Sequence, residues 1–507
     1  MSPKTRKALA LLHIRSPRLK VFHYQCVLPS MAASNSIKPF SPEEIQRILS
    51  HLQQPAVFMN MTCGWPVLHW TAEHLSGCLG DKLIRFRLGR KEETNAPLFE
   101  TQCPYVEATL AHFVSWTQDQ AGTDEGPFSE YPRSEYWAYA DYKYIALLFQ
   151  HQPSMFEGVK WSDFGFEGRN GRESTLWIGT EGANTPCHLD SYGCNLVLQV
   201  QGRKRWHLFP PEDTVNLYPT RIPYEESSVF SQVDVLHPDL MRFPAFQAAR
   251  AHIVTLQPGQ VLYVPRHWWH YVESVDPVTV SVNSWIELEV DDVARVSEAV
   301  TKAVVCALKR TPSDDNTDDW LNPTEEGVAS HDENMQYVNL AVRACVHGQR
   351  GLCHRELNQD MRDTRPVKRD SRGQIRKKSD SVRDSVPFSV PFGPHLTPVL
   401  CRQESSPETS TKDLEFSSDT AQKTKLTSAV RLHQGEYECS PDLTQCRPCD
   451  CADERSGNSS EDYEEPAHTT ITTNDLLDCL MHPDVIACVT KLLLERHTGN
   501  HRTSTSS

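Results

Sequence analysis

The chain has 507 residues, enough for one large domain or two ordinary ones with tails. Hydrophobic residues make up 38% of it, which is low for a fully folded chain of this size and indicates that part of the sequence buries little surface. The formal net charge of -15 argues against broad electrostatic binding to nucleic acid, and no apolar stretch is long enough to span a membrane.

The cysteine content and the first residues bear on the compartment. The 16 cysteines have irregular spacing, unlike a disulfide framework, and there is no secretory signal. Residues 1–38 carry lysines and arginines but no acid, a composition shared by organelle transit peptides and by an unstructured leader upstream of a second start at Met31. We expect a disordered leader over 1–39 and a cytoplasmic protein, with the nucleus as the alternative.

The folded region begins near Phe40. The run Ser41-Pro42-Glu43-Glu44 combines a helix N-cap, a proline at the first helical position and acids in the first turn, and so predicts a helix start. Further predicted elements are a strand over 55–59, a loop with Trp65 and Trp70, a helix over 71–78, and segments of helical or mixed periodicity over 104–118 and 136–151.

The middle third of the chain consists of short β-rich runs separated by turn signals such as Gln201-Gly202-Arg203 and Pro258-Gly259. Many short strands with tight turns indicate a sandwich or a barrel. The predicted strands cover 174–180, 195–201, 204–209, 252–256, 260–264, 270–275 and 278–288.

The last part of the chain changes character again. Apolar residues recur at helical spacing over 291–309 and 334–346, which predicts C-terminal helices within 291–350. The apolar stripe of 291–309 suits either a homodimer interface or packing on the sheet. Residues 351–470 are polar and are expected to form a disordered tail, whereas 471–497 predicts a terminal helix.

Two features of the predicted tail remain open. The cysteines between Cys439 and Cys451 have partly zinc-like spacing, but without a matching second pair, so reduced unstructured thiols are the alternative. The basic run 362–383 suits an acidic partner, nucleic acid or a nuclear-localisation signal, against plain solvated disorder.

A candidate metal site lies in the middle third. In His188-Leu189-Asp190 two ligand-type side chains fall on one face of an extended segment, because side chains alternate with period two. Two imidazoles and one carboxylate on one face of a metal leave the open positions that non-haem Fe(II) oxygenases need. The triplets at His237 and His482 have a proline in the middle and are interpreted as turns or caps.

The surroundings of His188 strengthen this interpretation. Thr185 precedes it, a buried strand from Asn195 follows, and a glycine turn then leads into Lys204. Much later, a strand and a proline run into Trp268-Trp269-His270, which supplies the second imidazole. His207 and His267 are rejected as ligands in favour of surface or supporting positions, and Trp268 and Trp269 are interpreted as packing residues.

Taken together, the runs 185–211 and 258–285 resemble the JmjC/cupin-8 oxygenases, especially the factor-inhibiting-HIF-like hydroxylases and a vertebrate branch named for association with a small heat-shock protein. The resemblance covers about 40–288. It implies an all-β core, a double-stranded β-helix (jelly-roll) barrel within a domain over 40–290, flanked by N-terminal and C-terminal helices.

The resemblance also implies site residues and cofactors. Fe(II) would be held by His188, Asp190 and His270, with 2-oxoglutarate as cosubstrate and dioxygen as oxidant. The remaining matches are Lys204, Thr185 and Tyr139 for the cosubstrate carboxylate, Asn195 and Asn283 as polar neighbours, and Trp285 as an aromatic wall. Tyr136, Tyr142 and Tyr144 are close rivals of Tyr139.

Two functions follow from the resemblance. The first is a hydroxylase acting on a protein or, less favoured for so acidic a chain, on RNA; histone demethylation is least favoured. The second is a weakly catalytic or non-catalytic interaction protein that binds a small heat-shock protein in the stress response. A buried lysine on a central strand favours the first, since a dicarboxylate inside a barrel needs a buried cation.

Overall fold

The computed structural model describes residues 38–91, 94–118, 126–309, 320–325, 327–363, 388–402 and 471–498, and only the backbone of 349–363. Residues 1–37 of the predicted leader, the Cys439–Cys451 cluster and most of the basic run 362–383 lie outside the described residues. None of the described helices combines the length and the apolar character needed to cross a membrane.

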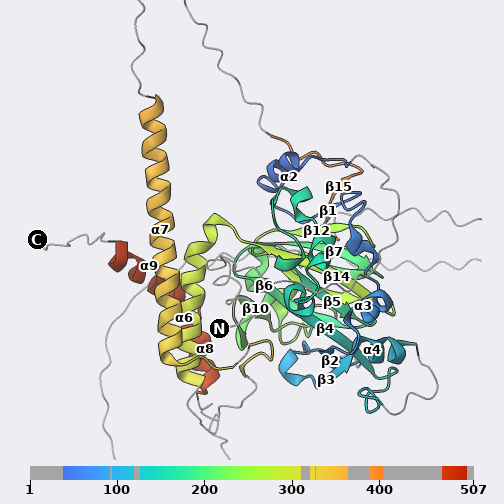
Figure 1. The fold of residues 1–507 in the computed structure, drawn as a ribbon. Coiled ribbons are helices and arrows are strands. Elements are labelled where there is room, and N and C mark those ends of the chain that lie inside the picture. Colours follow the sequence, from blue (N-terminus) through green and yellow to red (C-terminus); the bar gives the residue numbers. More distant parts are fainter. Residues whose placement is uncertain are drawn as a thin grey trace, which may run out of the picture. The chain divides into compact units, whose positions relative to one another are not determined.

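Two antiparallel sheets form the centre of the described chain (Figure 1). The larger has the strand order β15-β1-β12-β7-β14-β5-β4-β2-β3 and the smaller β11-β8-β13-β6-β10-β9. This architecture confirms the predicted jelly-roll class. The strands are β1 (Ala56–Phe58), β2 (Leu83–Arg90), β3 (Tyr105–Thr109), β4 (Tyr136–Tyr144), β5 (Thr175–Gly179), β6 (Asn184–Asp190), β7 (Cys194–Gln201), β8 (Lys204–Phe209), β9 (Pro219–Glu225), β10 (Ser228–Ser231), β11 (His252–Leu256), β12 (Val261–Val264), β13 (Trp269–Ser274), β14 (Thr279–Ile286) and β15 (Leu396–Pro398).

Period-two alternation sorts the side chains of the central strands between two layers. In β7, Leu196 and Leu198 pack into the core beneath the N-terminal helices, whereas Val197 packs into the core between the two sheets. Asn195 shares the parity of Val197 and therefore faces the space between the sheets. The same rule places Lys204 of β8 on the inner face together with Trp206.

The N-terminal helices are α2 (Pro42–Leu49), α3 (Ala72–Leu79), α4 (Leu110–Thr117) and α5 (Ile145–Leu148). The predicted start of α2 is confirmed, because Glu44 N–H donates to Ser41 Oγ at 3.2 Å and Ser41 N–H donates to Glu44 Oε2 at 2.7 Å. The two segments of mixed periodicity resolve into a strand followed by a helix, β3 with α4 and β4 with α5.

The C-terminal helices are α6 (Asp292–Lys309), α7 (His331–Asp363), α8 (Thr473–Leu480) and α9 (Pro483–Thr498). The terminal helix predicted over 471–497 is thus two helices, because Pro483 cannot continue α8 and instead begins α9. The predicted cap at His482 is confirmed: Asp484 N–H donates to His482 Nδ1 at 3.3 Å.

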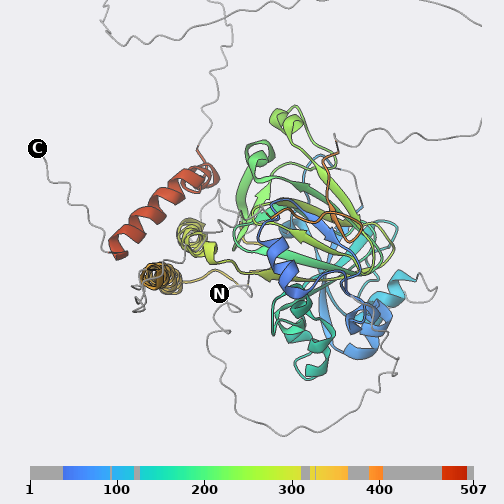
Figure 2. The same cartoon turned by 90° about the horizontal axis from the view of Figure 1, so that it is seen from above.

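Helix α6 is covered by helices of its own chain (Figure 2). Val296 and Ala299 pack against α7, and Val305 packs in a second cluster that includes Leu477 of α8. An ion pair between Arg221 and Glu298, at 2.7 Å, connects α6 to β9. Packing within the chain therefore accounts for the apolar stripe of α6, and the homodimer stays a prediction.

Residues 388–402, here called the returning segment, depart from the predicted disordered tail. Strand β15 pairs with β1 at the edge of the larger sheet, and Val399 N–H donates to Pro55 O at 2.9 Å. Leu396 and Val399 are buried. The reason is local: these apolar residues interrupt an otherwise polar tail, and β1 offers unpaired backbone groups for them to bond.

Candidate active site

The imidazoles of His188 and His270 face each other between β6 and β13. The two residues are paired across the strands, and their ring centroids lie 4.2 Å apart. Each Nδ1 is held by a backbone carbonyl two residues earlier in the chain, at 2.9 Å for His188 and 3.0 Å for His270. A carbonyl only accepts, so the proton sits on Nδ1 and the lone pair on Nε2, the form in which imidazole binds metals.

Asp190 lies two residues after His188 on β6, on the same face of the strand, and is buried. Its Oδ2 accepts a hydrogen bond from Trp285 Nε1 at 3.1 Å. No group of three or more His, Cys, Asp or Glu side chains in the described part of the chain is placed to hold a metal ion as it stands. The donor types of His188, His270 and Asp190 nevertheless match those of an Fe(II) site.

A β-bulge brings Thr185 to the same cavity as His188. Strict alternation would put residues three apart on opposite faces, but Val272 pairs with Thr185 while His270 pairs with His188, so β6 carries one extra residue here. Pro186, inside the strand, is the sequence signal of this irregularity.

Lys204 supplies a buried cation at the other end of the cavity. Its Nζ donates to Tyr139 Oη at 3.0 Å and lies 4.9 Å from the centroid of that ring and 5.9 Å from the ring of Trp177. Burial lowers the pKa of Lys204 to about 7, although the charge of Asp141 acts in the opposite direction. Tyr139, whose pKa is raised by burial, also hydrogen-bonds Thr185, so lysine and both hydroxyls form one polar group.

The contacts of Tyr139 distinguish it from the alternative tyrosines Tyr136 and Tyr142. Tyr139 is the one that contacts Lys204, whereas Tyr136 packs against Tyr131 with ring centroids 5.2 Å apart. Tyr142 also reaches the cavity and stacks near Trp285, with centroids 6.5 Å apart.

The two asparagines form a hydrogen-bonded relay in the cavity wall. Trp177 Nε1 donates to Asn283 Oδ1 at 2.8 Å, and Asn283 Nδ2 donates to Asn195 Oδ1 at 2.9 Å. Both asparagines are buried and line the same cavity as the two imidazoles, and the relay fixes the orientation of their amide groups.

All the predicted site residues except Asp190 line one cavity, here called the inner cavity, of about 40 Å³. Five further residues of the cavity wall were not predicted: Trp206, Trp177, Val197, Val272 and Ser281. Two of them could have been found from alternation, because Trp206 lies two residues after Lys204 on the same strand face and Trp177 lies on the predicted strand 174–180.

The residues rejected as ligands lie elsewhere. His207 faces Tyr271 on the other side of β8, and burial lowers its pKa to about 4. His267 Nε2 bonds Ser191 O at 3.0 Å. Trp268 and Trp269 are buried in two packing clusters, as predicted.

The sequence is similar to known proteins over most of its length. The family described as the cupin-like domain matches residues 42–292. The HSPB1-associated protein 1 homolog of Danio rerio is 56% identical over 470 residues, 92% of this chain and 100% of that protein. Human HSPB1-associated protein 1 is 50% identical over 476 residues, 90% and 94% of the two chains.

A more distant relative is the lysine-specific demethylase 8 of Danio rerio, 28% identical over 247 residues, which are 46% of this chain and 53% of that protein. The family match over residues 42–292 contains every strand of the two sheets except β15, and it contains the site built between them. The chain therefore belongs to the cupin-like JmjC family.

Proposed function

We propose that the chain is an Fe(II)- and 2-oxoglutarate-dependent oxygenase that hydroxylates a polypeptide. The observation that carries this proposal is the inner cavity itself. It presents two imidazoles, each with Nδ1 committed to a carbonyl, and a buried ammonium group, Lys204, in the same space. A scaffold has no physical need for a buried lysine, whose burial costs free energy unless an anion joins it.

The residues fit the two groups by chemistry. His188, His270 and Asp190 would hold the iron. Lys204 with the hydroxyls of Tyr139 and Thr185 would bind the far carboxylate of 2-oxoglutarate, and one such charge-assisted hydrogen bond contributes about 1.5–3 kcal/mol. When bound, the metal and cosubstrate use dioxygen to oxidise a C–H bond of the substrate.

The rest of the cavity keeps these groups in place. Carbonyl bonds fix the plane of each imidazole, and the asparagine relay fixes the wall beside them. Trp177 and Trp206 surround the polar groups with apolar surface and exclude water, which strengthens every charge interaction inside. Lys204 must carry its proton to bind an anion, so its lowered pKa makes binding sensitive to pH near neutrality.

The proposal is tested by anaerobic isothermal titration of 2-oxoglutarate into the full chain loaded with Fe(II) or Mn(II). We expect metal-dependent binding that is lost in His270→Ala and in Lys204→Ala. His207→Ala and Lys160→Ala are matched controls, because His207 faces away from the cavity and Lys160 is exposed. Absence of binding to folded wild-type protein would overturn the oxygenase proposal.

A polypeptide is favoured over RNA as substrate because the chain has a formal net charge of -15. Incubation of the loaded protein with a cell extract, followed by mass spectrometry, should reveal peptides heavier by one oxygen atom that are absent with His270→Ala. Modified nucleosides in place of peptides would contradict the choice of substrate.

A second function is favoured by the names of the relatives that match most of the chain, which state association with HSPB1. We propose that this chain also associates with that small heat-shock protein in the cytoplasm. We expect purified HSPB1 to co-purify with the full chain and equally well with His270→Ala. That result would show that association does not depend on the proposed catalytic site. A fluorescent fusion confined to another compartment would argue against the cytoplasmic location.

A further inference from the structure

The turn that follows Asp190 is held by side chains of α6 and of neighbouring loops. Strand β6 ends at Asp190, whose partner across the strands is Ser228 of β10. The pairing of β13 with β6 reaches His188. The backbone of Asp190 therefore lies at the end of its strand, where hydrogen bonds from other parts of the chain decide how firmly it is held.

Glu298 of α6 joins the two chain segments that meet at Asp190. Its Oε1 accepts a hydrogen bond from Ser191 Oγ at 2.9 Å, and Ser191 follows Asp190 directly. Its Oε2 accepts a hydrogen bond from Ser227 N–H at 2.9 Å, and Ser227 precedes Ser228. Ser191 N–H also donates to Ser227 O at 2.8 Å. One buried carboxylate therefore ties both strands together at the position of the proposed metal ligand.

The carboxylate of Glu298 is charged. Arg221 of β9 donates to both of its oxygens, from Nη1 at 2.7 Å and from Nη2 at 2.8 Å. Burial acts to raise the pKa of Glu298, but Arg221 and the hydrogen bonds from Ser227 and Ser191 act more strongly and lower that pKa below its ordinary value. Because a charged acceptor makes a stronger hydrogen bond than a neutral one, the Ser191 hydroxyl is held in a fixed position.

Two further side chains hold the same turn. Asp291, which lies just before α6 and is fully buried, accepts a hydrogen bond from Gly193 N–H at 3.0 Å. His267 Nε2 donates to Ser191 O at 3.0 Å, and His267 lies three residues before His270. The turn is therefore bonded both to the start of α6 and to the segment that carries the second imidazole of the site.

We propose that Glu298 is a positioning residue of the proposed iron site. Through Ser191 and Ser227 it holds the backbone of Asp190 where the carboxylate of Asp190 can bind the metal. Glu298 lies beyond residue 292, where the family match ends, so the site depends on a helix that follows the matched domain. This inference rests on the proposed oxygenase function for its meaning, but the coupling of Glu298 to Asp190 is measurable without metal.

The first test measures Mn(II) binding to the full chain by electron paramagnetic resonance of the free ion, after urea denaturation has shown that each variant folds. Ser191→Ala removes the hydroxyl bonded to Glu298 but leaves the ion pair with Arg221, and should increase the Mn(II) dissociation constant about tenfold. The matched control is Ser297→Ala on the same helix, whose hydroxyl lies 3.1 Å from Thr490 Oγ1 of α9 and which should leave the Mn(II) affinity unchanged. Equal affinities of Ser191→Ala and the wild-type chain would overturn the proposal.

A second variant assigns the effect to the carboxylate. Glu298→Gln should weaken Mn(II) binding at least as much as Ser191→Ala does. The double variant should bind Mn(II) no more weakly than Glu298→Gln alone, because both changes break the same link. Additive losses in the double variant would show that the two residues act independently and would overturn the assignment. If Glu298→Gln fails to fold, the comparison of Ser191→Ala with Ser297→Ala still decides.

A metal-free readout separates this inference from the proposed function. Trp285 Nε1 donates to Asp190 Oδ2 at 3.1 Å, so the indole N–H of Trp285 reports on the position of Asp190. In the metal-free chain with isotope-labelled tryptophan, and with the signal assigned by Trp285→Phe, Ser191→Ala should shift this NMR signal and Ser297→Ala should not. An unchanged signal in Ser191→Ala would overturn the coupling. Failure of the wild-type chain to bind Mn(II) would count against the oxygenase proposal, while the indole signal would still decide whether Glu298 positions Asp190.

Discussion

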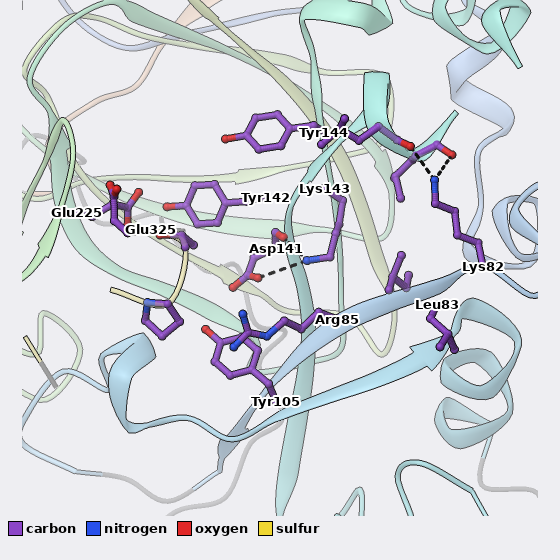
Figure 3. Close-up of a pocket in the computed structure, with 15 residues that line it drawn as sticks. Lys82, Leu83, Arg85, Tyr105, Asp141, Tyr142, Lys143, Tyr144, Glu225 and Glu325 are labelled. Carbon is purple, nitrogen blue, oxygen red and sulfur yellow. Dashed lines mark hydrogen bonds and ion pairs between the residues drawn. The ribbon is translucent and has the colours of Figure 1, made fainter. Parts of the chain in front are cut away.

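The inner cavity shares the wall at Tyr142 with a cavity of about 460 Å³, called the outer cavity, which is lined by residues of β2, β3 and β4 together with Glu225 and Glu325 (Figure 3). The two cavities are built in different ways. The inner cavity takes its functional groups from neighbouring strands of the barrel, where alternation and strand pairing fix each position. The outer cavity draws on segments far apart in the sequence, around Lys82, Tyr105, Asp141 and Glu325, and its charges partly face solvent. In both cavities the buried charges are therefore costly to change, whereas Arg85 at the rim of the outer cavity is exposed and adjustable at small cost.

The largest expected effect concerns Asp141, which lines the outer cavity. Arg87 is fully buried, and its Nε donates to Asp141 Oδ2 at 2.7 Å. Arg87→Met leaves that buried carboxylate only the longer ion pair with Lys143, at 3.8 Å, so the free energy of unfolding should fall by about 3–5 kcal/mol. Urea denaturation measures this, with the exposed Arg85→Met on the same strand as control. A change similar to that of Arg85→Met would show that the ion pair contributes little.

The second prediction concerns Lys204, whose pKa of about 7 lies below the ordinary lysine value of roughly 10.4. Between these values the unfolded chain binds more protons than the folded one, so stability rises with pH. From pH 7 to 9 the wild-type chain should gain about 2–3 kcal/mol relative to Lys204→Met, at up to about 1.4 kcal/mol per pH unit. Urea denaturation at several pH values measures this difference. If the free energies of unfolding of the two proteins changed equally with pH, the lowered pKa of Lys204 would be contradicted.

The third prediction uses the same group in binding. Only protonated Lys204 attracts a carboxylate, so the dissociation constant of 2-oxoglutarate should increase by up to about tenfold per pH unit above pH 7, with uptake of a proton on binding. Titration calorimetry at pH 6.5 and 8.5, in two buffers of different ionisation enthalpy, measures both effects. Lys204→Arg keeps its charge and should lack this pH dependence.

The smallest effect is expected at the rim of the outer cavity. Arg85 is exposed and its main contact is the ring of Tyr105. Arg85→Gln should change the free energy of unfolding by about 0.5 kcal/mol or less and leave 2-oxoglutarate affinity unchanged. A loss of several kcal/mol would show that the rim is as tightly coupled as the inner cavity.

Local rules predict only part of the inner cavity, and the remaining site residues follow from the resemblance to the oxygenase family. Apolar runs bounded by glycine turns predict β7 and β8, and His188 with Asp190 on one face follows from alternation alone. The placement of Thr185 needs a bulge whose position depends on pairing with β13. Alternation alone would therefore place the side chain of Thr185 on the face of β6 opposite to that of His188.

The outer cavity and strand β2 escaped prediction for a different reason. In β2 the buried Ile84, Phe86 and Leu88 do alternate, but the fully buried Arg87 interrupts the polar face that alternation requires. Its partner Asp141 lies 54 positions away, so its burial follows only from tertiary structure. The proximity of Glu225 to Tyr142 likewise has no local signature.

The returning segment has a consequence for the order of synthesis. Strand β14 ends at Ile286 and β15 begins at Leu396, 110 positions later. While a ribosome makes the intervening residues, β1 lacks its outer neighbour and exposes a strand edge to other nascent chains. A transcript or protease that ends the chain before residue 388 makes this transient state permanent, so such products should be recovered mainly as aggregates.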